Sequence, residues 1–367
     1  MISDNSIIRP GSALSLLPNW LSTPSDKSKL LVIYWPTACG KTSLTIELAK
    51  QYNGEVINAD SRQIYRGMNI GTGKVTAEQM QGIPHYLLDI LDIHEMYGVG
   101  EFAPEARRII ADIRARGKLP ILSGGTGLFI DSVVANFTLP EVVADWGYRD
   151  ELESFRLAEW NEALWEKLNT IDPEYALELD PRNYRYVIRG LEIFKATWQS
   201  KKVLWQKTES PYDFLRVTPY DGDREKLYQK INQRVEEMFD AGLVEEVKNL
   251  MQNAKCIEQS LLPLDMPLGI SPMQNARICN NEQLVRELNT MVTQKIKNPQ
   301  FCILHFAFWI QEIIKKLPGL NAIGYREILP YLAGEQSLER TIELVQQNSR
   351  HYAKRQLTWF RRYNDAL

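Results

Sequence analysis

The chain has 367 residues, of which 44% are hydrophobic and 24% are charged, and its formal net charge is -3. This length and composition fit a folded protein with one large core or two to three smaller ones. The small negative charge excludes a global attraction to nucleic acid, so a surface that binds RNA would have to be a local basic patch.

Cysteine spacing and the apolar runs bear on the compartment. The four cysteines, Cys39, Cys256, Cys279 and Cys302, form no C-x-x-C pair, which argues against a zinc site or a disulfide framework. Residues 1–28 carry little positive charge and resemble neither a secretory signal nor a transit peptide, so we expect a flexible N-terminal extension. The densest apolar run, 301–310, is shorter than the roughly 18 residues that cross a bilayer. We therefore expect a cytoplasmic protein that uses no membrane.

The stretch 29–137 alternates short apolar runs with helical patterns. "KLLVIY", "EVINADS" and "LPILSGGTG" predict strands, while "KTSLTIELAKQY" and "PEARRIIADIRARG" predict helices. Strands and helices in this alternation predict parallel βαβ units, with ligands at the carboxyl ends of the strands. The expected fold class is α/β, with a P-loop NTPase-like parallel sheet core, a helical insertion domain and a helical C-terminal region.

Helical patterns replace the strand patterns after about residue 138. We expect a helical, mobile insertion domain at 138–200, a return to the core with one long amphipathic helix at 201–253, and a C-terminal helical region at 317–367. Between them, 254–316 is an atypical insertion that holds three of the four cysteines. It is either an additional lobe or sequence that belongs to no folded element, and the sequence does not decide between them.

Residues 34–42, "YWPTACGKT", have the tail of a phosphate-binding loop between a predicted strand and a predicted helix. Such a loop needs inward N–H groups, a small residue before its lysine and a helix that begins at once. Gly40 supplies the small residue, Lys41 a cation for phosphate, and Thr42 a hydroxyl for Mg²⁺ or phosphate. Trp35 stands where the first glycine of the motif belongs. This change is a perturbation at the mouth of the loop, a neutral position, or a step away from function.

Asp60 follows the second predicted strand, in "NADSRQIYRGMNIGTGK". Its carboxylate could hold Mg²⁺, act as a general base, or cap a turn with Ser61. Arg62, Arg66 and Lys74 make this stretch basic, which suits either a polyanionic partner or a solvated face.

Nine segments resemble the successive motifs of the tRNA dimethylallyltransferase (isopentenyltransferase) family, in the family's order. They are "PTACGKT", "INADSRQIYRGMNIGTGK", "IPHYLLDI", "YGVGEFAPEA", "LPILSGGTGLFI", "DPRNYRYVIRGLEIF", "INQRVEEMFDAGLVEEV", "LNAIGYREI" and "YAKRQLTWFRR". The resemblance covers about 29–253 and 317–362, roughly three quarters of the chain. A phosphate loop alone is weak evidence, whereas nine ordered segments are specific.

The resemblance implies an enzyme that moves a dimethylallyl group from dimethylallyl diphosphate to N6 of adenine 37 of tRNA and releases pyrophosphate. It implies that Asp60 is the general base and that Arg234 reaches the diphosphate, although Arg234 could instead form a surface salt bridge. Thr42 would serve catalysis and hold Mg²⁺, the expected cofactor. The implied diphosphate-binding residues are Thr37, Ala38, Cys39, Gly40, Lys41, Thr42 and Arg234.

The resemblance also implies contacts with the anticodon stem-loop of tRNA, made by a monomer whose adenine substrate is flipped out of its stack. The implied contacts are Ser61, Arg62, Gln63, Thr126, Arg149, Arg182, Asn183, Tyr184, Arg185, Tyr186 and Arg355. The family usually has arginine where this chain has Tyr186, so that side chain could stack on a base where arginine would pair with phosphate. Arg355 lies in "RHYAKRQLTWFRR", a basic and aromatic segment typical of an RNA backbone platform.

Three alternatives remain at this point. The phosphate loop alone would allow a P-loop kinase or NTPase, although such an enzyme would not need the basic C-terminus. An adenylate-type isopentenyltransferase acts on free nucleotides, but the long helical C-terminal part favours tRNA. Trp35 and the 254–316 insertion also allow a tRNA-binding homologue with weakened or lost catalysis.

Overall fold

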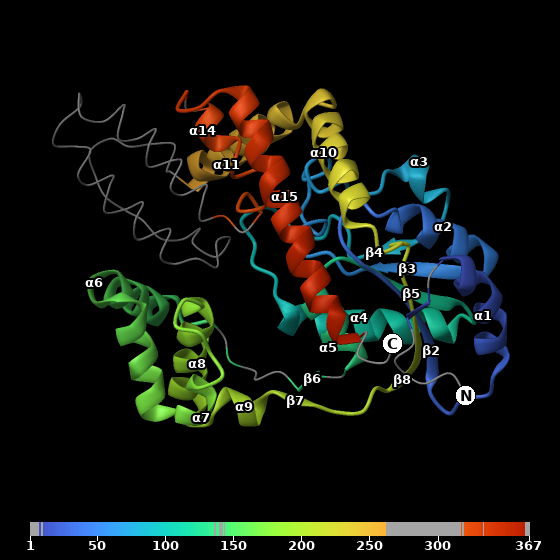
Figure 1. Cartoon of the computed structure of the whole chain (residues 1–367), viewed down its shortest axis with the longest axis horizontal. Helices are drawn as coiled ribbons and strands as arrows, with labels where there is room; N and C mark the ends of the chain where they lie inside the picture. Colours follow the sequence, from blue (N-terminus) through green and yellow to red (C-terminus); the bar gives the residue numbers. More distant parts are fainter. Residues whose placement is uncertain are drawn as a thin grey trace. The chain divides into compact units, whose positions relative to one another are not determined.

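The computed structural model describes residues 7–8, 10–135, 137–138, 142, 144–261, 317, 319–332 and 334–363. The chain forms two compact units, one made of Met1–Val134 with Pro211–Leu367 and the other of Ala135–Ser210 (Figure 1). The second unit coincides closely with the helical insertion domain expected at 138–200. Most of the expected 254–316 insertion lies outside the described residues.

The larger unit is built on a six-stranded parallel sheet with the order β1-β8-β2-β5-β3-β4. Its strands are β1 (Ile7–Ile8), β2 (Ser28–Tyr34), β3 (Gly54–Asn58), β4 (His85–Tyr86), β5 (Leu119–Gly124) and β8 (Tyr212–Val217). The three strands predicted from the sequence, β2, β3 and β5, are confirmed and lie side by side. On one side of β2 lie β5, β3 and β4, which follow it in the chain, and on the other side lies β8. The connection from β2 to β3 and the connection from β5 to β8 therefore run in opposite directions, so β2 lies at a switch point of the sheet.

Apolar side chains of β2 alternate between two cores, one on each face of the sheet. Leu31 and Ile33 pack toward α1 (Pro10–Ser22) and α2 (Lys41–Gln51). Leu30, Val32 and Tyr34 contribute to the other core. Its helices are α4 (Val99–Ala115), α5 (Gly127–Val134), α10 (Arg224–Asp240) and α15 (Leu338–Phe360). A strand buried on both faces explains why "LLVIY" reads as a continuous apolar run.

Part of the expected flexible N-terminal extension is ordered, and for Pro10–Ser22 that expectation was wrong. These residues form α1, in which Leu17 and Trp20 are buried. The indole N–H of Trp20 donates to Asp213 Oδ1 at 2.8 Å. The Ser, Pro, Asn and Asp residues of 1–28 suggested flexibility, but Leu17 and Trp20, spaced i, i+3, attach this short helix to the sheet.

The long helix expected across 224–251 is two helices, because Gly242 adopts a left-handed φ of 96° after α10 ends. The second, α11 (Leu243–Leu261), enters the region expected to be an insertion. Glu246 of α11 accepts backbone N–H bonds from Asn69, Ile70 and Gly71 at 2.8–3.2 Å, and the Tyr325 hydroxyl donates to it at 2.6 Å. One carboxylate therefore holds the loop that follows Asp60.

The smaller unit is a helical cluster with its own core. Its elements are β6 (Phe137–Thr138), α6 (Trp146–Ile171), α7 (Pro173–Ala176), α8 (Tyr184–Thr197), α9 (Lys201–Leu204) and β7 (Gln206–Lys207). The core contains Leu164 and Leu168 of α6 together with Val187 and Leu191 of α8. Among the helices of the described residues, none combines the length and apolarity that a membrane span requires.

Candidate active site

The carboxyl ends of three neighbouring strands are level. Tyr34 of β2 is in register with Gly124 of β5, and Asn58 of β3 is in register with Ser123 of β5. The phosphate loop, Asp60 and the second glycine loop therefore leave the sheet at one edge. This is the edge at which parallel α/β sheets bind their ligands.

The phosphate loop runs directly into α2. Gly40 is the N-cap, with a left-handed φ of 91°, and no side chain caps the first turn. The N-terminal amides of α2 consequently point toward the loop, which is the arrangement that binds anions at helix N-termini. The hydroxyl of Thr42 lies on this exposed first turn.

The side chain of Lys41 bends back onto the phosphate loop. Its ammonium donates to the carbonyl oxygens of Trp35 and Pro36, both at 2.8 Å. Burial lowers the pKa of Lys41, the charge of Asp60 raises it and that of Arg234 lowers it. The Cys39 thiol is buried, donates to the Pro36 carbonyl at 2.9 Å, and has its pKa raised by burial. Because a buried thiol with a raised pKa is a poor nucleophile, Cys39 serves the loop through its backbone and packing.

Asp60 takes part in a turn, which is one of the roles considered from the sequence. Its Oδ1 accepts the backbone N–H of Arg62 at 2.9 Å, so it does form a turn. Its Oδ2 lies toward Gly125, since a Cβ added at that glycine would be 3.8 Å away. One oxygen fixes the side chain, and the other approaches the second glycine loop.

Arg234 of α10 reaches this edge of the sheet. Among the ion pairs of the described residues, none involves Arg234, so the surface salt bridge considered from the sequence is not seen there. A Cβ added at Gly73 would lie 1.6 Å from Nη2 of Arg234, so the guanidinium occupies the space that the glycine leaves open. Burial lowers the pKa of Arg234, while the charge of Asp60 raises it. Two cations, Lys41 and Arg234, and the carboxylate of Asp60 thus act electrostatically on one another.

Trp35 is explained by its aromatic neighbours. Its ring is 5% exposed and stacks on Phe360, with centroids 5.5 Å apart and planes at 17°. It also stacks on Tyr220 with centroids 5.8 Å apart. The backbone of Trp35 has φ of 143°, a conformation that suits the glycine expected at this position. The side chain therefore compensates for an unfavourable backbone by joining the core below the loop.

The C-terminal helix α15 supplies contacts that the sequence analysis did not identify. Gln356 hydrogen-bonds both the phosphate loop and the second glycine loop. Trp359 donates to Asp131 Oδ2 at 3.0 Å, and the Tyr363 hydroxyl donates to the other oxygen of Asp131. All three side chains lie in or beside "YAKRQLTWFRR", the basic and aromatic segment expected to bind the RNA backbone.

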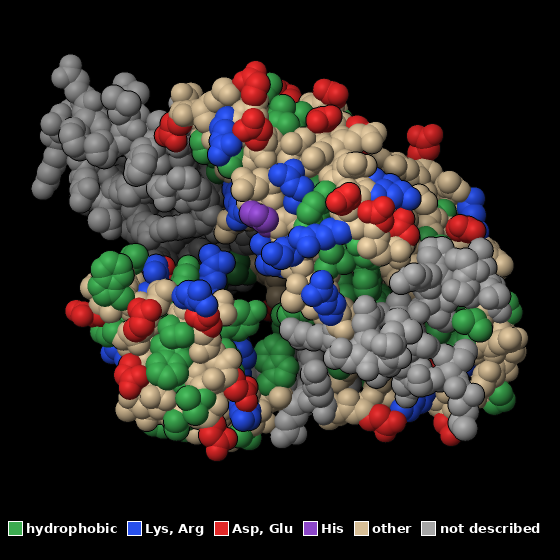
Figure 2. Space-filling view, viewed as in Figure 1, with side chains coloured by type: hydrophobic (Ala, Val, Ile, Leu, Met, Phe, Trp, Pro, Cys, Tyr) green, Lys and Arg blue, Asp and Glu red, His purple; other side chains and the backbone are tan. Residues whose placement is uncertain are grey.

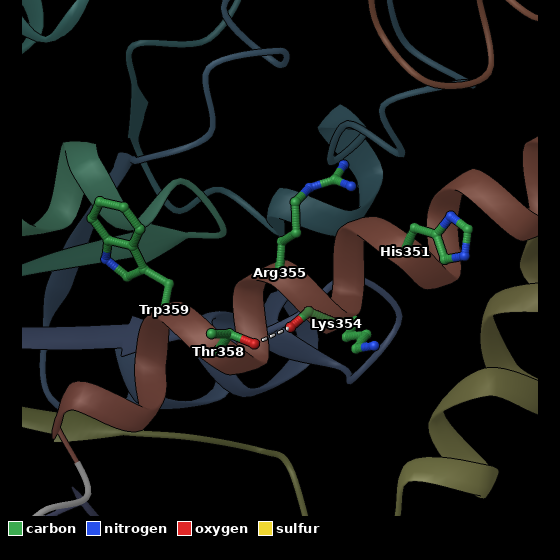
Figure 3. A pocket seen from close by; sticks show the side chains of 5 residues that line it. All are labelled: His351, Lys354, Arg355, Thr358 and Trp359. Carbon is green, nitrogen blue, oxygen red and sulfur yellow. Dashed lines mark hydrogen bonds between the residues drawn. The ribbon is translucent and has the colours of Figure 1, made fainter. Parts of the chain in front are cut away.

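The outer surface of α15 carries Arg355. A hollow of about 400 Å³ is lined by His351, Lys354, Arg355, Thr358 and Trp359. Arg355 and Trp359 project from the same side of the helix (Figure 3). Lys and Arg side chains gather over this part of α15 (Figure 2). Cations beside a partly exposed indole fit a nucleic-acid backbone with an unstacked base.

The remaining candidate tRNA contacts of the larger unit connect the segment after β3 with the glycine loop after β5. The backbone N–H of Ser61 donates to Thr126 Oγ1 at 3.0 Å, and the backbone N–H of Thr126 donates to the Ala59 carbonyl at 3.1 Å. Gln63 Nε2 donates to the carbonyls of Thr72 and Gly73. These residues brace the segment around Asp60.

Arg149, in the smaller unit, is engaged within that unit. Its guanidinium makes a bidentate pair with the buried Glu192 at 2.7–2.8 Å and lies 4.8 Å from the Trp146 ring. Glu192 also accepts from Arg189 and from the backbone N–H of Asp145. The tRNA contact of Arg149 stays a prediction.

The segment 182–186 begins α8 and is rich in cation–aromatic contacts. Arg182 is 84% exposed on its side chain and pairs with Asp180, while Asn183 is the N-cap of α8. The ring of Tyr184 lies 5.8 Å from the Arg185 guanidinium. Tyr186 is 54% exposed, and the Lys201 ammonium lies 5.5 Å from its ring. Tyr186 therefore faces a cation of its own unit, which an arginine at this position would repel.

A divalent ion would have to fit the donors at this edge. Within the described residues no group of three or more His, Cys, Asp and Glu side chains could enclose a metal. Mg²⁺ seldom uses such a cage and is usually held by one or two protein oxygens together with substrate phosphates. The Thr42 hydroxyl and the Asp60 carboxylate are donors of that kind, so they fit an ion that binds with a diphosphate.

A phosphate loop at the switch point of a parallel sheet, with a separate helical unit inserted after α5, defines a P-loop-like α/β protein. Comparison with known proteins gives the family. The model of the family described as IPP transferase matches residues 63–298 and 281–363. Two curated relatives are both named tRNA dimethylallyltransferase. The relative from Halalkalibacterium halodurans is 39% identical over 91% of this chain and 88% of its own length, and that from Bacillus cytotoxicus is 38% identical over 93% and 90%.

Solved structures agree with the sequence comparison. The full-length tRNA isopentenylpyrophosphate transferase from Bacillus halodurans is 38% identical, covers 91% of this chain and 87% of its own, and gives a TM-score of 0.54. A eukaryotic dimethylallyltransferase acting on tRNA is 27% identical, with coverage of 91% and 70% and a TM-score of 0.61. The chain belongs to the IPP transferase family, which decides against the P-loop kinase alternative.

Proposed function

We propose that this chain transfers a dimethylallyl group from dimethylallyl diphosphate to N6 of adenine 37 in the anticodon stem-loop of tRNA. The dimethylallyl transfer to tRNA extends to this chain what the names of its relatives say of them, while N6 of adenine 37 is what the resemblance of its motifs implies. The observation that carries it is the meeting of Lys41, Arg234 and Asp60 at one edge of the sheet. Two cations suit a diphosphate, and a nearby carboxylate suits a proton acceptor.

In the proposed reaction, the bond between C1 of the dimethylallyl group and the diphosphate oxygen breaks as a bond from N6 to C1 forms. The electron pair of the broken bond leaves with pyrophosphate, whose charge is stabilised by Lys41, Arg234 and the loop residues Thr37 to Thr42. Asp60 takes one proton from N6, since the lone pair of the exocyclic amine is delocalised into the ring and makes it a poor nucleophile. Mg²⁺, held by Thr42 with the diphosphate, would add positive charge at the leaving group.

The tRNA contacts are proposed for two surfaces. In the larger unit they are Ser61, Arg62, Gln63, Thr126 and the α15 surface around Arg355. In the smaller unit they are Arg149 and the segment 182–186. We further propose that the protein acts as a monomer and that it works in the cytoplasm. Analytical ultracentrifugation of the purified chain with and without tRNA tests the monomeric state.

The decisive assay incubates purified protein with Mg²⁺, labelled dimethylallyl diphosphate and unmodified tRNA that carries A36 and A37, and counts label in the RNA. Label is expected for the wild type. Asp60→Asn keeps an oxygen that can accept the Arg62 N–H but removes the base, so transfer should fall by at least about a hundredfold while tRNA binding is retained.

Asp92→Asn is the matched control, because Asp92 is a half-exposed carboxylate of the same unit that pairs with Arg66. It should transfer as the wild type does. Absence of label with intact tRNA binding would refute the proposal and support a binding homologue without catalysis. Wild-type activity in Asp60→Asn would refute Asp60 as the base while leaving the reaction itself in place.

A further inference from the structure

One buried amide connects the C-terminal helix to the edge of the sheet. Gln356 of α15 is 5% exposed. Its Oε1 accepts the backbone N–H of Thr37 at 3.2 Å, and its Nε2 donates to the carbonyl of Gly125 at 2.8 Å. A single side chain thus uses both its acceptor and its donor on the backbones of two loops, which follow β2 and β5.

Gln356 also borders the residue proposed as the base. A Cβ added at Gly125 would lie 2.5 Å from Gln356 Nε2 and 3.8 Å from Asp60 Oδ2, so the amide and the carboxylate approach the same glycine. The glycine loop is in turn bonded to the segment of Asp60, because Thr126 donates its backbone N–H to Ala59. Phosphate loop, glycine loop and base are therefore linked through one side chain.

The same helix meets the loop at a second point. Phe360, one turn after Gln356, stacks on Trp35 at 5.5 Å. The helix itself is anchored on the far side of the glycine loop by Trp359, whose ring packs on Gly127 and whose N–H donates to Asp131. The position of the Gln356 amide is consequently fixed by packing on both sides.

We propose that Gln356 is a positioning residue that sets the spacing between the phosphate loop and Asp60, and so controls affinity for the prenyl diphosphate. The inference rests on the proposed function and deepens it. Gln356 touches no reacting atom in this arrangement. Its effect is geometric. The positions of loop amides that bind a diphosphate must be fixed to well under about 1 Å. The hydrogen bonds of Gln356 to Thr37 and to Gly125 fix the two loops on either side of that site.

Two substitutions separate this role from simple packing. Gln356→Met keeps the length and volume of the side chain but removes both amide hydrogen bonds. The Thr37 N–H and the buried Gly125 carbonyl then lose their partner. Gln356→Glu still accepts from Thr37 but places a carboxylate oxygen against the Gly125 carbonyl. Gln346→Met is the matched control, because Gln346 lies on the same helix and its Nε2 donates only to α10, at Asn232 and Glu236.

The experiment measures kcat, the KM for dimethylallyl diphosphate, the KM for tRNA and the unfolding midpoint of each variant. Binding of inorganic pyrophosphate with Mg²⁺ is measured separately by calorimetry. Gln356→Met is expected to raise the donor KM and the pyrophosphate Kd about tenfold, with an unchanged KM for tRNA. Gln356→Glu is expected to raise both further, and Gln346→Met to change neither.

The proposal is overturned if donor KM and pyrophosphate Kd in Gln356→Met match those of Gln346→Met. It is equally overturned if both KM values stay constant and kcat falls only in proportion to the folded fraction, which is the result of a purely structural role. Should Gln356→Met not fold, Gln356→Glu carries the same test. If the wild type transfers no label, the proposed function fails, yet the calorimetric comparison still decides the role of Gln356.

Discussion

Replacing Trp35 with glycine restores the residue that phosphate loops usually have, and the structure predicts that this harms the protein. Two effects oppose each other. Glycine relieves a backbone held at φ of 143°, which stabilises the folded state by about 1–3 kcal/mol. It also removes a ring that is 5% exposed and stacked on both Phe360 and Tyr220.

The lost ring has the larger effect. Burying an aromatic side chain removes about 150–250 Å² from water, which at about 25 cal/mol per Å² amounts to about 4–6 kcal/mol. Truncation of buried Phe or Trp costs about 3–5 kcal/mol in practice. Subtracting the backbone relief leaves Trp35→Gly less stable than wild type by about 2 kcal/mol, with a raised donor KM because the loop loses its contact with α15.

Urea unfolding followed by far-ultraviolet circular dichroism measures the change, and Trp35→Ala is the control. Alanine loses the same ring but keeps the backbone strain, so it should be less stable than Trp35→Gly by about 1 kcal/mol or more. A Trp35→Gly protein at least as stable as wild type would refute the reasoning. Alanine and glycine variants of equal stability would show that the backbone is not strained.

Three further outcomes follow from contacts elsewhere. The buried Glu55 pairs with Arg116 and Lys118, and the Arg116 hydrogen bond holds its pKa at about 2, below the ordinary 4.5. The stabilisation by ionised Glu55 is present above pH 4.5 and is lost as pH falls toward 2. Glu55→Gln should therefore be less stable than wild type by about 3 kcal/mol at pH 7. In urea unfolding at pH 3, more than half of this difference in stability should have disappeared. Glu246→Ala should lose about 3 kcal/mol in urea unfolding, because three backbone amides and the Tyr325 hydroxyl lose one charged acceptor; a loss below about 0.5 kcal/mol would contradict this. Tyr186→Arg should steepen the salt dependence of tRNA binding by about one unit of slope in filter-binding titrations, whereas an unchanged slope would place Tyr186 away from the RNA backbone.

Several features could be predicted from the sequence because they are local. The apolar run of β2, the loop that ends in Gly40, Lys41 and Thr42, and the helix that follows are contiguous, and their periodicity and glycine placement specify them directly. The helical character of 146–204 follows from amphipathic patterns of the same kind. Two wrong expectations were also local: residues 1–28 were expected to be flexible although Pro10–Ser22 carry the apolar residues of α1, and Gly242 divides the expected long helix into α10 and α11.

Contacts between distant segments were decided only by the tertiary structure. Trp35 looked like a defect, because its compensation comes from Phe360, more than three hundred residues away along the chain. Gln356 looked like one polar residue in a basic segment, because the groups it bonds belong to loops after β2 and β5. Periodicity and motif spacing report on neighbours in sequence, whereas the level strand ends that bring Lys41 and Asp60 to one edge arise from sheet order and register, and α10 adds Arg234. The sequence by itself determined the family, three central strands of the sheet and the phosphate loop, while the tertiary structure decided the order of the strands and how that loop is supported.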